Sequence, residues 1–217
     1  MVNAEEQYKN ELVVRANDSV HFFSNPMKPE RERIACADFL RALGIVFSPE
    51  DLVPVAQEKG RPDVKFGDAL FQVCEAFDQG RKRHDETRAH LECLESAKNI
   101  EGTFLPVREK KPLSYAEVYV VVTEALTKKY NWYRHMRIEC SGFDALVYIN
   151  LLGRFLTPNF SQPAYAVLLD QGWRSVSFFL FPYSHVIYAT EAAPEFLRPF
   201  SGQTRRECDD ADKFFKL

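Results

Sequence analysis

The chain lacks the features that would place it in a membrane, in an oxidising compartment or among nucleotide-driven enzymes. No apolar run approaches the roughly 20 residues that a membrane helix needs. The five cysteines form no CxxC pair, are odd in number and follow no secretory signal. No glycine-rich phosphate loop is present. We therefore expect a cytoplasmic protein with reduced thiols and no membrane partner.

Net positive charge is also missing. The formal net charge is -3 and the sequence pI is about 6.0, so no overall field attracts the protein to nucleic acid. Any phosphate contact must come from a local cluster such as Arg81, Lys82 and Arg83. The alternative is that these residues form a solvated helix face.

The chain is long enough to bury one substantial core. It has 217 residues, of which 46% are hydrophobic. We expect a single domain over residues 1–217, with an N-terminal extension at 1–22, an internal linker at 100–112 and a charged tail at 201–217.

Hydrophobic periodicity predicts both helices and strands. A helix is expected from Pro26 to Leu43, and a second helix runs from the Ser114 capping box to about Tyr133. The remaining expected elements are a solvated helix within 78–99, a short helix at 164–169, short β pieces within 44–57, two alternating strands within 62–77, a central strand at 143–152 and a strand pair within 173–189.

The stretch RPDVKFGDALFQVCEAFDQGRKR (61–83) is the most informative in the chain. Asp63 and Lys65 lie two positions apart, as do Gln72 and Cys74, so each pair shares one face of its strand. Gly67 with the residue after it forms a hairpin turn that brings the two strands together.

The order of these elements resembles the restriction-endonuclease-like core, whose signature is PD followed by (D/E)xK. Asp63 behind its proline supplies the first half, and Gln72, Val73 and Cys74 occupy the second. The runs FSNPMKPERER, FDALVYINLLGRFL and QGWRSVSFFLFPYSHVIYA extend the likeness. Together they resemble a bacterial family of unknown function described as "putative endonucleases". The implied fold is α/β, a central mixed sheet flanked by helices with an extra helix and a C-terminal β-hairpin.

This resemblance implies hydrolysis of phosphodiester bonds in DNA or another nucleic acid with Mg²⁺ or Mn²⁺. The implied metal ligands are Asp63, Gln72, the carbonyl of Val73 and Glu32, because that ion prefers carboxylate and other oxygen ligands. A lysine is expected at position 74, where this chain has cysteine. Lys65 is the nearest substitute on the face of Asp63, and the basic run at 81–83 would contact nucleic acid.

Two departures support a competing interpretation. Gln72 keeps an oxygen donor but lacks a carboxylate's charge, and Cys74 cannot act as a cationic lysine. The alternative is a catalytically lapsed nuclease fold that binds nucleic acid or protein. Glu32 could equally belong to a surface ion-pair array, and Asp63 could be a turn residue. A third possibility is a partner docked on Tyr115 and Tyr119 of the second helix.

Overall fold

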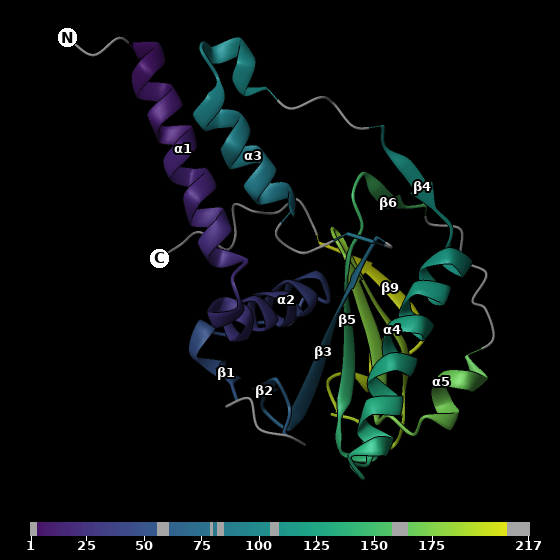
Figure 1. The fold of residues 1–217 in the computed structure, drawn as a ribbon. Coiled ribbons are helices and arrows are strands. Elements are labelled where there is room, and N and C mark those ends of the chain that lie inside the picture. The colour runs from purple at the N-terminus through teal and green to yellow at the C-terminus, as the bar shows by residue number, and fades with distance from the viewer. Residues whose placement is uncertain are drawn as a thin grey trace.

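The computed structural model describes residues 4–55, 61–78, 80–81, 85–104, 109–157 and 165–207. These residues form an α/β fold with a seven-stranded mixed sheet, confirming the predicted class (Figure 1). The strand order is β1-β2-β3-β5-β7-β8-β9. The strands at the centre, β3, β5 and β7, are parallel, whereas the pairs toward either edge are antiparallel.

The strands of the large sheet have the following bounds: β1 Leu52–Pro54, β2 Val64–Phe66, β3 Ala69–Phe77, β5 Asp144–Asn150, β7 Ser175–Leu180, β8 Tyr183–Ala189 and β9 Gln203–Arg206. A separate parallel pair consists of β4 Lys111–Leu113 and β6 Arg154–Leu156. The predicted hairpin, the central strand and the C-terminal strand pair are all present. Gly67 has a φ of 56°, which the tight β2–β3 turn requires and which glycine adopts without strain.

The helices are α1 Ala4–Phe22, α2 Lys28–Ala42, α3 Asp85–Ser96, α4 Tyr115–His135 and α5 Ala166–Asp170. Helix α2 packs on one face of the sheet and α4 on the other, while α1 and α3 lie side by side beyond the sheet (Figure 1). No helix among the described residues has the length and apolarity required to cross a membrane.

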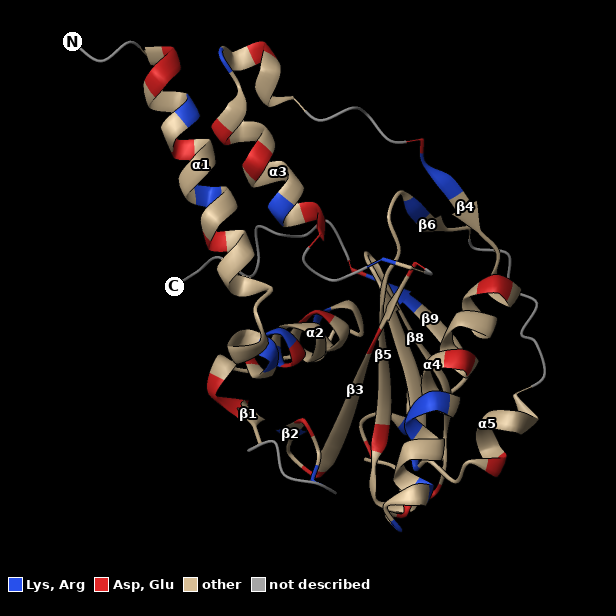
Figure 2. Ribbon diagram, viewed as in Figure 1, with Lys and Arg blue, Asp and Glu red and all other residues tan. Residues whose placement is uncertain are grey.

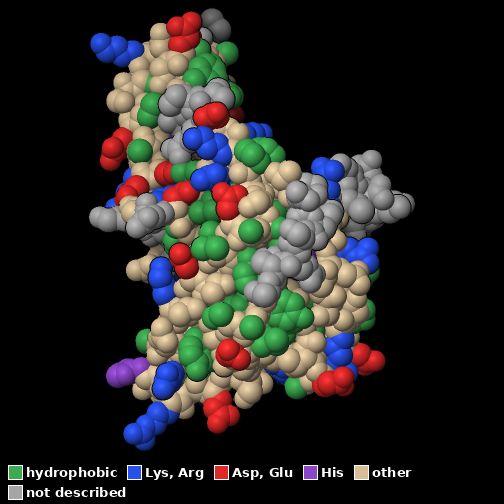
Figure 3. Space-filling view, turned by 90° about the vertical axis from the view of Figure 1, so that its right-hand side faces the viewer, with side chains coloured by type: hydrophobic (Ala, Val, Ile, Leu, Met, Phe, Trp, Pro, Cys, Tyr) green, Lys and Arg blue, Asp and Glu red, His purple; other side chains and the backbone are tan. Residues whose placement is uncertain are grey.

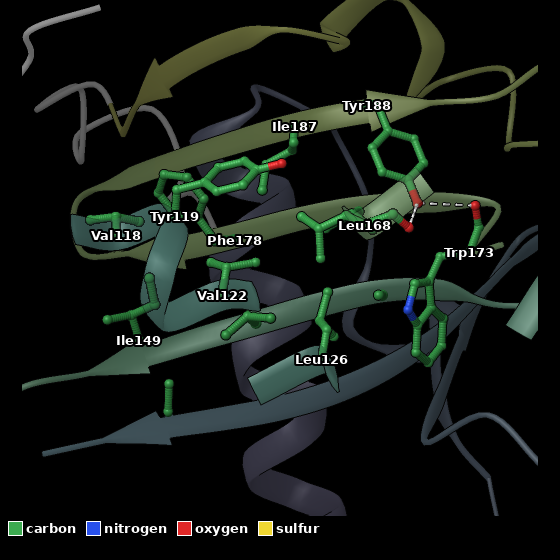
Figure 4. Packing of buried hydrophobic residues seen from close by; sticks show 14 of the residues in the cluster. Val118, Tyr119, Val122, Leu126, Ile149, Leu168, Trp173, Phe178, Ile187 and Tyr188 are labelled. Carbon is green, nitrogen blue, oxygen red and sulfur yellow. Dashed lines mark hydrogen bonds between the residues drawn. The ribbon is translucent and has the colours of Figure 1, made fainter. Parts of the chain in front are cut away.

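Helix α4 begins where the capping box predicted. The Glu117 backbone N–H donates to Ser114 Oγ at 3.2 Å, and the Ser114 N–H donates to a Glu117 carboxylate oxygen at 2.7 Å. The apolar stripe of α4 then packs on the sheet, with Val118, Val122 and Leu126 fully buried (Figure 4). This stripe forms the larger of two hydrophobic cores.

The second core lies between α2 and the opposite face of the sheet. Phe39 of α2 contacts Phe71 of β3 edge to face, with ring centroids 6.0 Å apart. Side chains alternate between the two faces along β3. Phe71 and Val73 face α2, whereas Cys74 and Ala76 pack in the core beneath α4. The same alternation places the side chains of the candidate site on two different faces of the sheet.

Several predicted boundaries differ from the structure. The N-terminal extension is a helix, α1, whose partner α3 comes from residues 85–96. Of the two β pieces predicted within 44–57, the second contains β1, which pairs with β2, and residues 45–47 are irregular. The predicted linker at 100–112 overlaps the start of β4, which pairs with β6, and the predicted charged tail includes β9, which pairs with β8.

Candidate functional site

Asp63 lies immediately before β2, beside Gln72 of β3. Its backbone N–H donates to the Phe71 carbonyl at 2.9 Å, which continues the hairpin by one residue. Gln72 Nε2 donates a hydrogen bond to Asp63 Oδ2. The structure therefore brings these two predicted side chains together on the face of the sheet covered by α4.

The pair is completed by two further donors. The Val73 backbone N–H donates to Asp63 Oδ2 at 2.9 Å, and the Tyr133 hydroxyl of α4 donates to Gln72 Oε1. The exposed fractions of Asp63 and Gln72 are 8% and 1%. We call this arrangement of Tyr133, Gln72 and Asp63 the buried hydrogen-bond chain.

Cys74 follows on the same strand face and is partly buried. It packs against the core beneath α4, and burial raises the pKa of its thiol to about 12. The thiol is therefore protonated at neutral pH. It supplies neither the positive charge expected at this position nor a thiolate nucleophile.

Glu32 approaches from α2 and is buried, with an exposed fraction of 7%. Its Oε1 lies 3.1 Å from Lys28 Nζ, while its Oε2 is buried without a hydrogen-bond partner. Burial raises the pKa of this carboxyl, and the charge of Asp63 adds to the effect, against the opposing attraction of Lys28 and Lys129. Glu32 and Asp63 thus influence each other electrostatically.

The predicted cationic residues lie elsewhere. Lys65 is exposed on β2, opposite Leu70 of β3. Arg81 donates to the Asn150 carbonyl at 2.6 Å, and Asn150 pairs with Phe77, five positions and about 16 Å along β3 from Gln72. The structure does not bring Arg81 to Asp63. Lys82 and Arg83 fall outside the described residues.

Two lysines near the site were not singled out from the sequence. Lys28 begins α2, and Lys129 of α4 lies with its Nζ 5.1 Å from the ring centroid of Tyr133. The signal for Lys129 was present, because positions 129 and 133 are one helical turn apart. Recognising it required knowing that Tyr133 would face Gln72.

The implied Mg²⁺ or Mn²⁺ does not fit this arrangement. Such an ion requires several oxygen ligands in near-octahedral geometry. Here Asp63 Oδ2 already accepts two hydrogen bonds, and the oxygen of Gln72 faces Tyr133. Among the described residues no group of three or more His, Cys, Asp or Glu side chains is placed to hold a metal ion.

A further buried carboxylate, Asp144, was hidden in the apolar run that predicted β5. It is fully buried and accepts from the Leu70 N–H at 3.0 Å and from Ser175 Oγ at 2.8 Å, and it pairs with Arg174. Its oxygens thus bind two neighbouring segments of the chain, at β3 and at the start of β7. This complete set of partners indicates a structural role.

The third possibility, a partner docked on α4, receives little support from burial. Tyr115, Tyr119 and Val122 are buried within the protein, whereas Val120 is 56% exposed. Figure 3 views the molecule from the side of α4 and α5, where hydrophobic side chains are interspersed with polar and charged ones. Packing on the sheet accounts for the buried aromatic residues.

Comparison with known proteins gives two findings. A solved structure, that of the protein of unknown function PA4535 from Pseudomonas aeruginosa strain PAO1, is similar to this chain and is described as belonging to the monooxygenase superfamily. The TM-score is 0.65 at 27% sequence identity, and the match covers 94% of this chain and 96% of that one. A search of curated proteins gave no match. Because the profile of the family described as "Putative endonuclease, protein of unknown function (DUF1780)" matches residues 4–210, the chain belongs to that family.

Proposed function

We propose that this chain is a nuclease-fold protein that binds nucleic acid and whose phosphodiesterase site has lapsed. The observation that carries the lapsed site is the buried hydrogen-bond chain. Asp63 and Gln72, which the nuclease signature would use to hold a metal, are instead joined to each other and to Tyr133. Both side chains are closed to solvent.

The order of elements supports a restriction-endonuclease-like core. Helix α2 precedes the antiparallel strands β1, β2 and β3, and a crossover containing α4 then leads to β5, which is parallel to β3. This order agrees with the core that the sequence resembled. The family description, which names an endonuclease, is consistent with it.

A basic edge supports nucleic acid as the partner. Lys111 and Arg154 lie opposite each other on β4 and β6, with Lys111 Nζ also 3.8 Å from a Glu109 carboxylate oxygen. Figure 2 shows Lys and Arg on β4, β6 and β9. Phe155, which follows Arg154 on β6, is 42% exposed. An exposed aromatic ring next to a cation suits stacking of a base beside a bound phosphate backbone.

Metal-dependent hydrolysis is the second candidate. It is favoured by the family description and by the uncommitted Oε2 of Glu32 near Asp63. In that case Asp63, Gln72, the Val73 carbonyl and Glu32 would hold Mg²⁺ or Mn²⁺. The hydrogen bonds of the buried chain would have to break first.

Calorimetry and cleavage assays separate the two candidates. We expect no heat when Mg²⁺ or Mn²⁺ is titrated into the protein, and no cleavage of plasmid or single-stranded DNA. Binding that Asp63→Ala abolishes, together with cleavage, would overturn the lapsed site. The double variant Gln72→Glu with Cys74→Lys restores the nuclease signature. A gain of Mn²⁺-dependent cleavage would show that the rest of the nuclease site is intact and that these two residues account for the loss of activity.

Binding is tested separately by fluorescence anisotropy with labelled oligonucleotides. We expect Arg154→Glu combined with Lys111→Glu to weaken binding at least about tenfold and to flatten its salt dependence, because phosphate contacts release counterions. Lys65→Glu is the matched control, since Lys65 is exposed near the opposite end of β3. Equal effects of the two changes, or no binding by the wild type, would contradict the proposal.

A further inference from the structure

An open groove of about 460 Å³ lies at the end of α4. It is lined by the last turns of α4, by the segment 137–141 that follows this helix and by the turn after α5. Helix α4 begins two residues after β4 and has 21 residues, so it is about 30 Å long. The groove is therefore a surface separate from the basic edge at β4 and β6.

The chain around this groove is basic, although the protein as a whole is acidic. Residues 128–137 contain two lysines, two arginines and one histidine but no acidic residue, whereas the formal net charge of the protein is -3. Figure 2 shows Lys and Arg on the half of α4 that is remote from β4. Cations at a helix C-terminus are attracted by the negative end of the helix dipole, which accounts for part of this pattern.

The helix dipole does not account for the backbone of Arg137. The Ile138 N–H donates to the Tyr133 carbonyl at 2.9 Å, and the Arg137 N–H donates to the Arg134 carbonyl at 3.1 Å. These two bonds are those of a Schellman motif, in which glycine usually occupies the place of Arg137. Arg137 has a φ of 58° and is the only non-glycine residue in the described part of the chain with a positive φ. A side chain retained at such a backbone cost indicates that the side chain itself is used.

The guanidinium groups of Arg134 and Arg137 have no acceptor within the residues that the structure describes. Both side chains are exposed, and both line the groove. Other arginines of the chain, such as Arg33, Arg81 and Arg174, pair with carboxylates. The two arginines at the end of α4 are thus available to an anion from solution.

One carboxylate, that of Glu139, also lines the groove. It accepts from Ser141 Oγ at 3.4 Å and forms no ion pair with either arginine, as judged from the described residues. Its charge opposes an anionic ligand, so the two guanidinium groups must outweigh it. A dianion gains more from two cations than a monoanion does.

We propose that this groove binds a phosphomonoester, with Arg134 and Arg137 contacting the phosphate oxygens and the Tyr130 ring packing against the group that carries the phosphate. Guanidinium forks match phosphate geometry, and a phosphomonoester carries about 1.5 to 2 negative charges at pH 7. The volume leaves room for a sugar beside the phosphate. The inference rests on the proposed function only in naming the terminal phosphate of a nucleic-acid strand as the source of this group.

The first test is calorimetric titration with adenosine 5′-monophosphate and with adenosine. We expect the monophosphate to bind at least about tenfold more tightly, because its phosphate makes charge-assisted hydrogen bonds. Arg134→Ala should abolish this preference, and Glu139→Gln should strengthen it. Lys128→Ala is the matched control: it removes one exposed cation from the same helix but outside the groove, and should change the affinity less than about twofold.

Arg137→Gly protects the test against misfolding. Glycine adopts the positive φ without strain, so the urea midpoint should be retained or raised while binding of the monophosphate weakens. An arginine with a purely structural role would not give this loss of affinity. Equal binding of the monophosphate and adenosine by the wild type, unchanged affinity in Arg137→Gly, or equal losses in Lys128→Ala and Arg134→Ala would overturn the inference.

Oligonucleotides that differ only in a 5′-phosphate identify the source and separate this inference from the proposed function. Tighter binding of the phosphorylated strand, lost in Arg134→Ala, supports both. Equal binding of the two strands, with a preference for the monophosphate over adenosine, assigns the groove to a small phosphomonoester. Binding of the monophosphate without binding of any oligonucleotide keeps the groove site and removes the proposed function.

Discussion

The two sides of β3 treat their buried polar groups differently. On the side of α4, Tyr133, Gln72 and Asp63 join in one hydrogen-bond chain. On the side of α2, Glu32 keeps one carboxylate oxygen buried and unsatisfied beside a cavity. Residues that the sequence grouped into one metal site are therefore divided between two environments.

This difference separates buried polar groups that stabilise the fold from one that does not. A buried polar group whose partners are complete stabilises the fold and has no capacity left for a ligand. A buried group with a missing partner raises the free energy of the folded state. The following changes test this contrast, from the largest expected effect to the smallest.

Asp63→Ala should lower the free energy of unfolding by about 3 kcal/mol, because it leaves Gln72 Nε2 and the Val73 N–H buried without an acceptor. Urea unfolding measures the change. Asp68→Ala, at the exposed tip of the β2–β3 turn, is the control and should have little effect. Unchanged or increased stability of Asp63→Ala would instead indicate an acid retained for function.

Tyr133→Phe should lower the free energy of unfolding by about 2 kcal/mol, since it leaves Gln72 Oε1 buried without a donor. The ring and its packing against Trp173 are retained. Combining Tyr133→Phe with Gln72→Leu should recover part of the loss, because both ends of the hydrogen bond are then removed. Strict additivity of the two changes would argue against the hydrogen-bond chain.

His185 of β8 is another buried polar residue with an unsatisfied atom. It is 2% exposed, lies edge to face with Tyr115, and has a buried Nε2 without a hydrogen-bond partner. Burial lowers its pKa from 6.5 to about 4. Below pH 6.5 the unfolded chain binds the proton first, so stability falls by about 1 kcal/mol between pH 6.5 and 5.5 and continues to fall toward pH 4.

His185→Phe removes this titration. Urea unfolding at pH 7.0, 6.0, 5.0 and 4.0 should show a flatter acid limb in the variant than in the wild type. Identical pH slopes in the two proteins would mean that the pKa of His185 is the same in the folded protein and in the unfolded chain.

Glu32→Gln should have the smallest effect on stability. Burial raises the pKa of the Glu32 carboxyl above 4.5, so the folded protein binds the carboxyl proton more tightly than the unfolded chain does. Ionisation of Glu32 at higher pH therefore destabilises the folded state. Relative to the wild type, the variant should gain stability as pH rises from 4.5 toward neutrality and lose that gain below pH 4.5. Loss of the Lys28 ion pair, worth about 0.5 kcal/mol, partly offsets the gain at pH 7. A variant less stable than wild type at pH 7 would show that Glu32 is satisfied.

Local patterns predicted much of the fold because they act over a few residues. The Ser114 capping box located the start of α4, and Gly67 located the hairpin that places Asp63 beside Gln72. The apolar run at 143–152 indicated a strand covered on both faces, and β5 lies between β3 and β7. The helix α1 was missed because its partner is α3, and no pattern within α1 identifies that partner.

The sequence by itself determined the elements of the central sheet, the helices on its two faces and the adjacency of Asp63 to Gln72, because helix and strand periods are properties of neighbouring residues. Only the tertiary structure decided that Tyr133 would bind Gln72 across 61 residues, and that Glu32 would line a cavity on the opposite side of β3. Packing brings distant elements together, and it sets which buried polar atoms find partners and which do not.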